Sequence, residues 1–308
     1  MNRKQAPRFS VAAAIPSFLI LLATIPVAVA SAPILLATDT ASRIAAAAIA
    51  PLIYILSYVA LAGAMTIPFQ GGIVRGKFPR DLRHSVYGPR RMYGLGWGAV
   101  FYFTPIYFAV MSIPTLRKAV LRIFGYRGSH SANIAPDAWI RDLPLLRLAD
   151  HSYVANKSTV GTNMCLIDGS ILVDEVTIGR NAMVGHLAMV APGSVLGDES
   201  ELGVGAALGV RTRIGCRTKV GPKSGIGHGA RIGDDVEVGT MSYIGIKAKI
   251  SNGVKIPGGA NIPEGSEITC SEELEQMIGA ETLALKKEVS RLRMVYSNQQ
   301  DQKMVGGM

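Results

Sequence analysis

The sequence has few of the residues that define several common classes of protein. Its three cysteines, Cys165, Cys216 and Cys270, form no CxxC pair, which argues against a disulfide framework or a cysteine zinc site and suits a reducing compartment. No two histidines stand at His-x4-His spacing, so we expect no metal site. Aromatic residues make up only 6% and are not interleaved with the bases. The net charge of +10 therefore favours a membrane surface over nucleic acid.

Two long apolar runs stand near the N-terminus. Residues 11–37 follow Arg3, Lys4 and Arg8, and residues 44–70 follow a short polar break. Each run is long enough to cross a bilayer core of ~30 Å, so we expect a transmembrane helical hairpin in residues 1–70. The segment 28–30, Ala-Val-Ala, also fits a cleavage site after a basic start. A cleaved signal peptide therefore remains an open alternative.

Residues 71–132 are basic on both sides of a third apolar run, residues 93–114. The bases that follow the second run place this side of the membrane in the cytoplasm. Because the third run has basic flanks at both ends, we favour a helix that lies in the interface or re-enters it, bent near Pro105, over a third crossing. The two basic groups are Arg75, Lys77, Arg80, Arg83, Arg90 and Arg91, then Arg117, Lys118, Arg122 and Arg127.

From Val154 to Ile268 every sixth residue is Leu, Ile or Val. Such a short fixed period sets the architecture. The next residue is usually Gly from Ile178 onward, and the fourth residue after each aliphatic is small from Ala182 onward, Val236 and Val254 being the largest. The positions are Val154, Val160, Leu166, Leu172, Ile178, Val184, Val190, Leu196, Leu202, Leu208, Ile214, Val220, Ile226, Ile232, Val238, Ile244, Ile250, Ile256, Ile262 and Ile268.

This period predicts short extended segments separated by corners, with three segments to a triangular coil of eighteen residues. We expect the aliphatics to form one buried column and the glycines to give the backbone freedom at the corners, where a Cβ would clash. The unbroken period indicates no inserted loop. Ile134, Ile140 and Leu146 predict an additional first coil, offset by two residues from the register that begins at Leu148. The β-helix is thus predicted over residues 133–270.

A different pattern follows Ile268. Six mostly apolar residues follow one another at alternating spacings of four and three, which predicts an amphipathic helix over residues 271–297. They are Ile278, Thr282, Leu285, Val289, Leu292 and Tyr296. This helix would either pair with its copies in a trimer or fold back over the last coil. Residues 298–308 are mostly polar, with two glycines before the final Met308, so we expect disorder there.

The hexads from Val154 to Ile268 resemble the left-handed parallel β-helix of the hexapeptide-repeat acyltransferase superfamily. Together with the two apolar runs, the β-helix makes the expected fold class an α+β membrane protein. The resemblance implies a homotrimer with sites in the grooves between prisms, and acyl transfer from coenzyme A or a carrier protein by a histidine base. The order of motifs before the repeats is similar to the membrane-embedded C-terminal half-modules of ε-poly-lysine synthetase and related nonribosomal peptide synthetase termini. Those motifs are residues 75–79, 121–126 and 142–150.

His186 and His228 are the candidate bases, because each stands at a predicted corner two residues after an inward aliphatic. They lie on different faces of one chain, although a trimer would let one from each of two chains approach. We prefer His186, which follows early coils where Asp168, Asp174 and Glu175 are available to orient the ring. The alternative for both histidines is a plain surface role.

Related transferases often carry the histidine on a loop from the early coils, and the corresponding stretch 164–169 has none. Asp168 is a substitute acid or, as we favour, a corner residue, and Cys165 is a weaker candidate nucleophile because no base stands near it in the sequence. A basic stretch along consecutive corners is a candidate site for the phosphates of coenzyme A or a lipid-linked substrate, or a solvated face. It comprises Arg211, Arg213, Arg217, Lys219 and Lys223.

These features predict a membrane-anchored homotrimer at the bacterial inner membrane with its β-helix in the cytoplasm. It would transfer an acyl, acetyl or aminoacyl group from acetyl-CoA or another thioester to a hydroxyl or amine of a membrane-associated acceptor, with a carrier protein or synthetase as a further partner. A non-catalytic trimeric scaffold for envelope polymer or peptide synthesis is the alternative, and amide-bond formation in a peptide-assembly system is a third.

Overall fold

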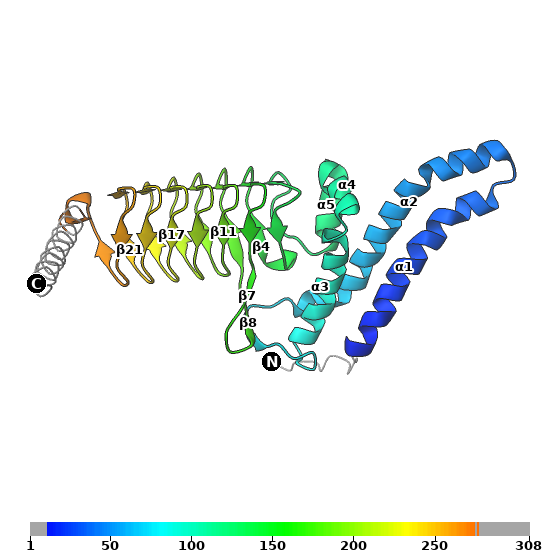
Figure 1. Cartoon of the computed structure of the whole chain (residues 1–308), viewed down its shortest axis with the longest axis horizontal. Coiled ribbons are helices and arrows are strands. Elements are labelled where there is room, and N and C mark those ends of the chain that lie inside the picture. Colours follow the sequence, from blue (N-terminus) through cyan, green and yellow to red (C-terminus); the bar gives the residue numbers. More distant parts are fainter. Residues whose placement is uncertain (1–10, 275, 277–308) are drawn as a thin grey trace, which may run out of the picture.

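The computed structural model describes residues 11–274 and residue 276. The chain folds into a group of helices at one end of a parallel β-helix, which extends away from them (Figure 1). Residues 271–274 are helical. The rest of the predicted C-terminal helix, and the predicted disordered tail, lie outside the described residues.

Two long helices form a hairpin at the N-terminal end. Helix α1 (Val11–Leu36) is followed by α2 (Thr40–Thr66), which Asp39 caps by accepting a hydrogen bond from the backbone N–H of Ser42 at 2.9 Å. The short helix η1 (Ile67–Gly72) continues α2. Both segments, Ala13–Leu36 and Thr40–Gly72, are long and apolar enough to cross a membrane. The predicted helical hairpin is therefore present.

The third apolar run forms two helices rather than one. Helix α3 (Tyr87–Phe101) and helix α4 (Thr104–Ser112) meet at an angle of 81°, and α5 (Pro114–Ile123) follows. Because Pro105 stands in the first turn of α4, the predicted bend is confirmed. These helices lie between α2 and the first coil (Figure 1), where the indole N–H of Trp97 donates to the carbonyl of Ile140 at 3.0 Å.

The β-helix has three flat faces, each a parallel sheet of seven strands. Seven coils each contribute one strand to every face, and we number them from the helices outward. Face 1 contains β2 (Asn133–Ile134), β5 (Tyr153–Val154), β10 (Met183–Val184), β13 (Glu201–Leu202), β16 (Lys219–Val220), β19 (Glu237–Val238) and β22 (Lys255–Ile256). Face 2 contains β3 (Trp139–Ile140), β6 (Thr159–Val160), β11 (Met189–Val190), β14 (Ala207–Leu208), β17 (Gly225–Ile226), β20 (Tyr243–Ile244) and β23 (Asn261–Ile262). Face 3 contains β4 (Leu146–Leu148), β9 (Val176–Ile178), β12 (Val195–Leu196), β15 (Arg213–Ile214), β18 (Arg231–Ile232), β21 (Lys249–Ile250) and β24 (Glu267–Ile268).

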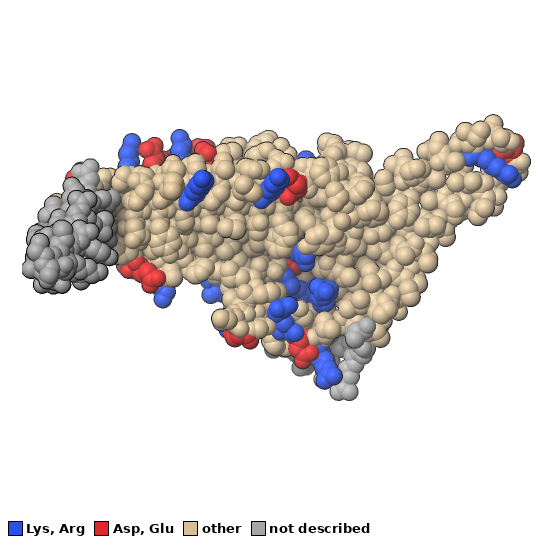
Figure 2. All heavy atoms as spheres, in the orientation of Figure 1, with Lys and Arg blue, Asp and Glu red and all other residues tan. Residues whose placement is uncertain are grey.

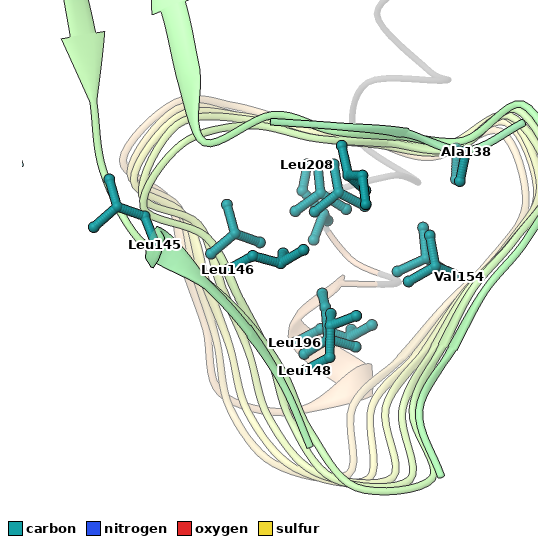
Figure 3. Packing of buried hydrophobic residues seen from close by; sticks show 14 of the residues in the cluster. Ala138, Leu145, Leu146, Leu148, Val154, Leu196 and Leu208 are labelled. Atoms are coloured by element: carbon teal, nitrogen blue, oxygen red, sulfur yellow. The ribbon is translucent and has the colours of Figure 1, made fainter. Parts of the chain in front are cut away.

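One aliphatic side chain from each strand points into the prism. Figure 3 shows Val154, Leu196 and Leu208 converging from the three faces. The predicted first coil is confirmed, because β4 reaches from Leu146 to Leu148 and pairs Leu148 with Ile178. Small polar residues complete the interior: the hydroxyl of Ser200, for example, donates to the carbonyl of Gly215 in the next coil at 2.6 Å. Among the described residues, no buried Ser or Thr hydroxyl is without a hydrogen-bond partner.

The corner glycines act by size rather than by conformational freedom. A Cβ on Gly197 would lie 2.5 Å from the backbone of Gly215 in the next coil. The left-handed conformation occurs two residues later, as at Glu199 (φ 58) and Arg211 (φ 57), and mostly in residues other than glycine. The prediction that glycine frees the corner backbone was therefore wrong, whereas the predicted Cβ clash is confirmed.

An insertion interrupts coil 2, contrary to the prediction of unbroken repeats. Val160 on β6 and Ile178 on β9 occupy neighbouring faces but are eighteen residues apart, whereas Val190 and Leu196 are six apart. The intervening residues form a β-hairpin of β7 (Asn163–Cys165) and β8 (Ser170–Val173), which projects from the prism (Figure 1). Leu166 and Leu172, predicted in the column, lie on this hairpin and are only half-buried.

The hairpin connects the β-helix to the helical part. Strand β1 (Gly76–Pro79), which follows η1, pairs antiparallel with β8 and makes a three-stranded sheet. Nearby, Arg90 of α3 donates to the buried carboxylate of Asp142 at 2.5 Å, and that carboxylate also accepts from Asn163 at 2.7 Å. Helices, first coil and hairpin are thus joined by backbone pairing and by a buried charged cluster.

Candidate functional site

A groove of about 800 Å³ runs along face 3 and the corner between faces 2 and 3. It begins beside the hairpin, where Arg75 and the carboxylates of Asp174 and Glu175 line it, and continues to coil 6. We call it the basic groove after its six cations, Arg75, Arg211, Arg213, Arg231, Lys247 and Lys249.

The repeat aligns three of these cations. Arg213 pairs in register with Arg231, and Arg231 with Lys249, on three consecutive strands of face 3. Neighbouring strands in a sheet are about 4.8 Å apart, so the three side chains form a row along the prism. All three are exposed.

The corner beside this row alternates between glycine and cation. Gly193, Arg211, Gly229 and Lys247 occupy the left-handed position of successive coils, with φ of 80°, 57°, 70° and 58°. A Cβ on Gly229 would contact only the Lys247 side chain at 3.6 Å, and one on Gly193 would meet Arg211 Cγ at 2.6 Å. The long side chains therefore lean over the glycines and form one wall of the basic groove.

Among the described residues, the ion pairs of the groove cations lie at its two ends. Asp174 accepts from Arg211 at 3.1 Å, and Glu175 accepts from Arg75 at 2.9 Å and from Arg147 at 3.3 Å. Lys249 pairs with Glu267 at 3.3 Å. Within the described part of the chain, Arg213, Arg231 and Lys247 form no ion pair. These three cations are available to an anionic ligand.

The five predicted basic residues do not all stand at corners: three lie at three different corners, and Arg213 and Lys219 lie on strands of two different faces. Arg211 and Arg213 line the groove. Arg217 lies between faces 3 and 1, where it pairs with Asp235 at 2.7 Å, and Lys219 stands on face 1 between Glu201 and Glu237. Lys223 lies between faces 1 and 2. Four groove cations were not predicted from the sequence: Arg75, Arg231, Lys247 and Lys249. A spacing of eighteen residues was the signal that relates Arg213, Arg231 and Lys249.

His228 lies beside Gly229 at the edge of the groove, but its ring has a structural contact. Its Nδ1 accepts the backbone N–H of Val210, eighteen residues earlier, at 2.8 Å. Asp234 and Asn252 accept the equivalent N–H groups of Cys216 and Asp234 at 2.7 and 2.9 Å. Because Nδ1 is the acceptor, the neutral ring carries its proton on Nε2. In this state the exposed nitrogen is a donor, not a base.

His186 lies on the corner between faces 1 and 2 and is half-buried. Its ring has no hydrogen bond within the described part of the chain, which leaves both nitrogens available for proton transfer. Exposed Leu187 and Val204 flank it. His186 and His228 are therefore on different corners of the same chain, and within the described residues neither forms a hydrogen bond or ion pair with Asp168, Asp174 or Glu175.

Asp168 is in the turn of the inserted hairpin, so the prediction of a prism corner was wrong. It accepts from the Ser170 N–H at 3.0 Å and pairs with Lys77 of β1 at 2.5 Å. The bonds from Lys77 and Ser170 lower the pKa of Asp168 below its usual range. A carboxylate that stays ionised in this way is a poor general acid. Cys165 is exposed on β7 of the same hairpin.

The described residues contain no group of three or more His, Cys, Asp or Glu side chains arranged to hold a metal ion. Coenzyme A and other acyl thioesters need none, since their phosphates are bound by cations and by backbone N–H groups.

Residues 211–246, which include Arg211, Arg213 and Arg231, match the family described as Bacterial transferase hexapeptide (six repeats). The chain thus carries the repeats, as well as the parallel β-helix, of the hexapeptide-repeat superfamily. No curated protein sequence matches the chain significantly.

Several solved structures match part of the chain at low sequence identity. The acetyltransferase domain of PglB from Neisseria gonorrhoeae, in complex with acetyl coenzyme A, is 20% identical over 48% of this chain and 64% of that one, with a TM-score of 0.36. A perosamine N-acetyltransferase mutant from Caulobacter crescentus, in complex with CoA and GDP-perosamine, is 21% identical over 47% and 60%, with a TM-score of 0.35. The UDP-N-acetylglucosamine acyltransferase of Francisella novicida is 13% identical over 45% and 59%, with a TM-score of 0.36. The chain spans less than two thirds of the length of each.

Proposed function

We propose that this chain is a membrane-anchored acyltransferase that binds an acyl thioester of coenzyme A in the basic groove. The observation that carries the proposal is the row of Arg213, Arg231 and Lys249 on the wall of a hexapeptide-repeat β-helix. Coenzyme A presents a diphosphate and a separate phosphate, and a row of cations spaced by one strand matches an extended anion of this kind.

The reaction would transfer the acyl group to a hydroxyl or amine. The acceptor oxygen or nitrogen attacks the thioester carbonyl while a base takes its proton, and collapse of the tetrahedral intermediate breaks the C–S bond. The proton then leaves with the thiol of coenzyme A. His186 is the proposed base, because its ring nitrogens are not used by the fold, whereas Nδ1 of His228 is.

His186 reaches a groove only if another copy of the chain supplies it. Face 2 carries no charge at its outward positions, which are Trp139, Thr159, Met189, Ala207, Gly225, Tyr243 and Asn261. If three copies meet through this face, the corner that bears His186 in one copy lies beside the groove corner of the next. His186 in coil 3 would then face Gly193 and Asp174, about 10 Å along the prism from His228 in coil 5.

Two features support anchoring at a membrane with the β-helix on the cytoplasmic side. Two helices have the length and apolarity to cross, and basic residues follow the second. The acceptor is then a membrane-associated molecule. The architectural likeness to the synthetase half-modules keeps an aminoacyl donor, delivered by a carrier protein, within the same proposal.

Calorimetric titration of the full chain in nanodiscs with acetyl-CoA tests the groove. We expect Arg213→Gln/Arg231→Gln to weaken binding at least tenfold, since each lost charge-assisted hydrogen bond is costly. The matched control Lys219→Gln/Lys255→Gln removes the same charge from face 1 and should leave binding unchanged. Equal loss in both variants would mean a non-specific charge effect and would defeat the proposal.

His186→Ala separates an enzyme from the scaffold alternative. It should retain acetyl-CoA binding and lose at least a hundredfold in acyl transfer to membrane extract, while His228→Ala retains transfer. The scaffold is favoured by one observation, that the inserted hairpin carries no histidine. It is the conclusion if millimolar acetyl-CoA does not bind the wild-type chain.

A further inference from the structure

The two groups of basic residues that flank the third apolar run differ in what they contact. In the first group, Arg75 pairs with Glu175, Lys77 with Asp168 and Arg90 with Asp142. These three cations therefore hold the helical part against the hairpin and the first coil.

The second group makes no such contacts. Lys118, Arg122 and Arg127, which follow one another on α5 and the loop after it, are exposed and form no ion pair within the described residues. We call them the α5 basic surface. Residues 82–136 contain no Asp or Glu at all. The pKa of nearby His130 is lowered by burial first and then by Arg122 and Lys118, as a positive potential requires.

Contacts between α5 and the helix α2 with its continuation η1 show where the α5 basic surface lies along the apolar span. A Cβ on Gly63 would clash with the side chain of Ile123 at the end of α5, and Gln70 Nε2 donates to the Ile123 carbonyl at 2.5 Å. Since the span runs from Thr40 to Gly72, the α5 basic surface next to Ile123 is level with its last turns.

The exposed residues around α4 are apolar, and the first of them lies deeper along the apolar span than the α5 basic surface. Phe103, between α3 and α4, packs against Tyr58 of α2 with ring centroids 5.6 Å apart. Tyr58 stands about 18 Å before Gln70 at the helical rise. Phe103, Phe108 and Ile113 are exposed. From α4 to the α5 basic surface, the exposed residues thus change from apolar to basic in the direction in which a bilayer changes from hydrocarbon to headgroups.

We propose that the α5 basic surface binds the headgroups of anionic phospholipids in the leaflet that receives the C-terminal end of α2. The inference depends on the membrane anchoring in the proposed function, but not on acyl-CoA binding. On the face drawn in Figure 2, the helical hairpin of α1 and α2 is uncharged except at its far tip, where the two helices connect. A lipid surface therefore fits better than a soluble acidic protein, which would have to approach past the bilayer.

The lipid that stays bound to the chain through purification is a direct measure of headgroup binding. The full chain is purified in neutral detergent with equal amounts of phosphatidylglycerol and phosphatidylcholine, and the bound lipids are quantified by mass spectrometry. We expect phosphatidylglycerol to be enriched on the wild-type chain. Each step from Lys118→Gln to the triple variant with Arg122→Gln and Arg127→Gln should lower the enrichment roughly fivefold, until it reaches the input ratio.

The groove provides the matched control. Arg213→Gln/Arg231→Gln/Lys249→Gln removes the same charge and should keep the lipid enrichment while losing acetyl-CoA, whereas the α5 triple variant should behave in the opposite way. Enrichment that survives in the α5 triple variant overturns the proposal, as does its loss in the groove variant. If the α5 variant unfolds, a salt titration of the wild type decides, because enrichment that does not fall with salt contradicts headgroup electrostatics.

Discussion

Coils 3–7 and coils 1–2 follow the same hexad pattern in the sequence but differ in structure. In coils 3–7 each strand is two residues long and neighbouring inward residues are six apart, as from Val184 to Val190. Coils 1–2 contain the longer strand β4, the short helix η2 (Leu143–Leu145) and the β7–β8 hairpin. A regular period in the sequence is therefore not always a regular period in space.

The inserted β7–β8 hairpin does not disturb the sequence period, because its twelve additional residues equal two hexads. From Val160 to Ile178 the spacing is eighteen instead of six, so the aliphatic register continues on both sides of the insertion. Among the described residues, the regular coils bury their column and form no hydrogen bond or ion pair with the helices. The irregular coils contact it through β1 and the Arg90–Asp142 pair. The regular coils therefore form the buried column and the groove wall, while the irregular coils fix the prism to the helices.

Truncating a leucine in each region should give the largest contrast. Leu196 is fully buried in coil 3, so Leu196→Ala should lower the free energy of unfolding by about 2–5 kcal/mol. Leu172 occupies the same hexad position but is half-buried on the hairpin, so Leu172→Ala should cost about 1 kcal/mol or less. Urea unfolding of the detergent-solubilised chain measures both. Similar losses would place Leu172 in the column after all.

Adding one methyl group at a corner tests the close approach of coils. A Cβ on Gly197 meets backbone of the next coil at 2.5 Å, whereas one on Gly161, at the same hexad position in coil 2, meets its nearest atom at 3.4 Å. Gly197→Ala should therefore destabilise by about 1–3 kcal/mol, and Gly161→Ala should be close to neutral. Thermal unfolding followed by circular dichroism distinguishes them, and a neutral Gly197→Ala would mean that the coils can separate.

Most of the fold was predictable because one hexad predicts the next. The aliphatic column, the first coil offset to Leu148 and the bend near Pro105 all follow from local sequence. The insertion was missed, although three local signals mark it: Met164 stands where a small residue is expected, Ile167 stands where a glycine is expected, and Asp168-Gly169 is a typical hairpin turn.

The site was less predictable for a geometric reason. A run such as Arg211 to Lys223 is continuous in the sequence but winds around three corners, whereas Arg213 and Arg231 are eighteen residues apart and adjacent in the sheet. Arg75 enters the groove only because β1 pairs with the missed hairpin. Long-range pairing of this kind leaves no trace in the spacing of nearby residues.

His228 tests whether a regular coil uses its histidine for structure. His228→Ala removes the acceptor of the Val210 N–H and should cost about 0.5–1.5 kcal/mol. His228→Asn should restore most of that stability, since the side chain of Asn252 accepts the equivalent backbone N–H, that of Asp234 in the preceding coil. Urea unfolding provides the measurement. If asparagine restores stability but acyl transfer is lost, His228 has a catalytic role that its capping bond does not explain.

The smallest effect is expected at the exposed pair of Lys77 and Asp168, which fixes β1 to the hairpin turn. Because the bonds from Lys77 and Ser170 lower the pKa of Asp168 in the folded state, its contribution is present above the unfolded pKa of about 4 and is lost as the pH falls through the folded pKa. Asp168→Asn should speed hydrogen exchange of the β1 and β8 amides at neutral pH by less than about fivefold. The difference from wild type should shrink in acid, where Asp168 itself becomes neutral, while the amides of coils 3–7 stay unchanged at every pH. A difference that persists unchanged in acid would show that the Asp168 side chain holds the turn by its shape, and that the charge on Lys77 contributes nothing to joining the irregular coils to the anchor.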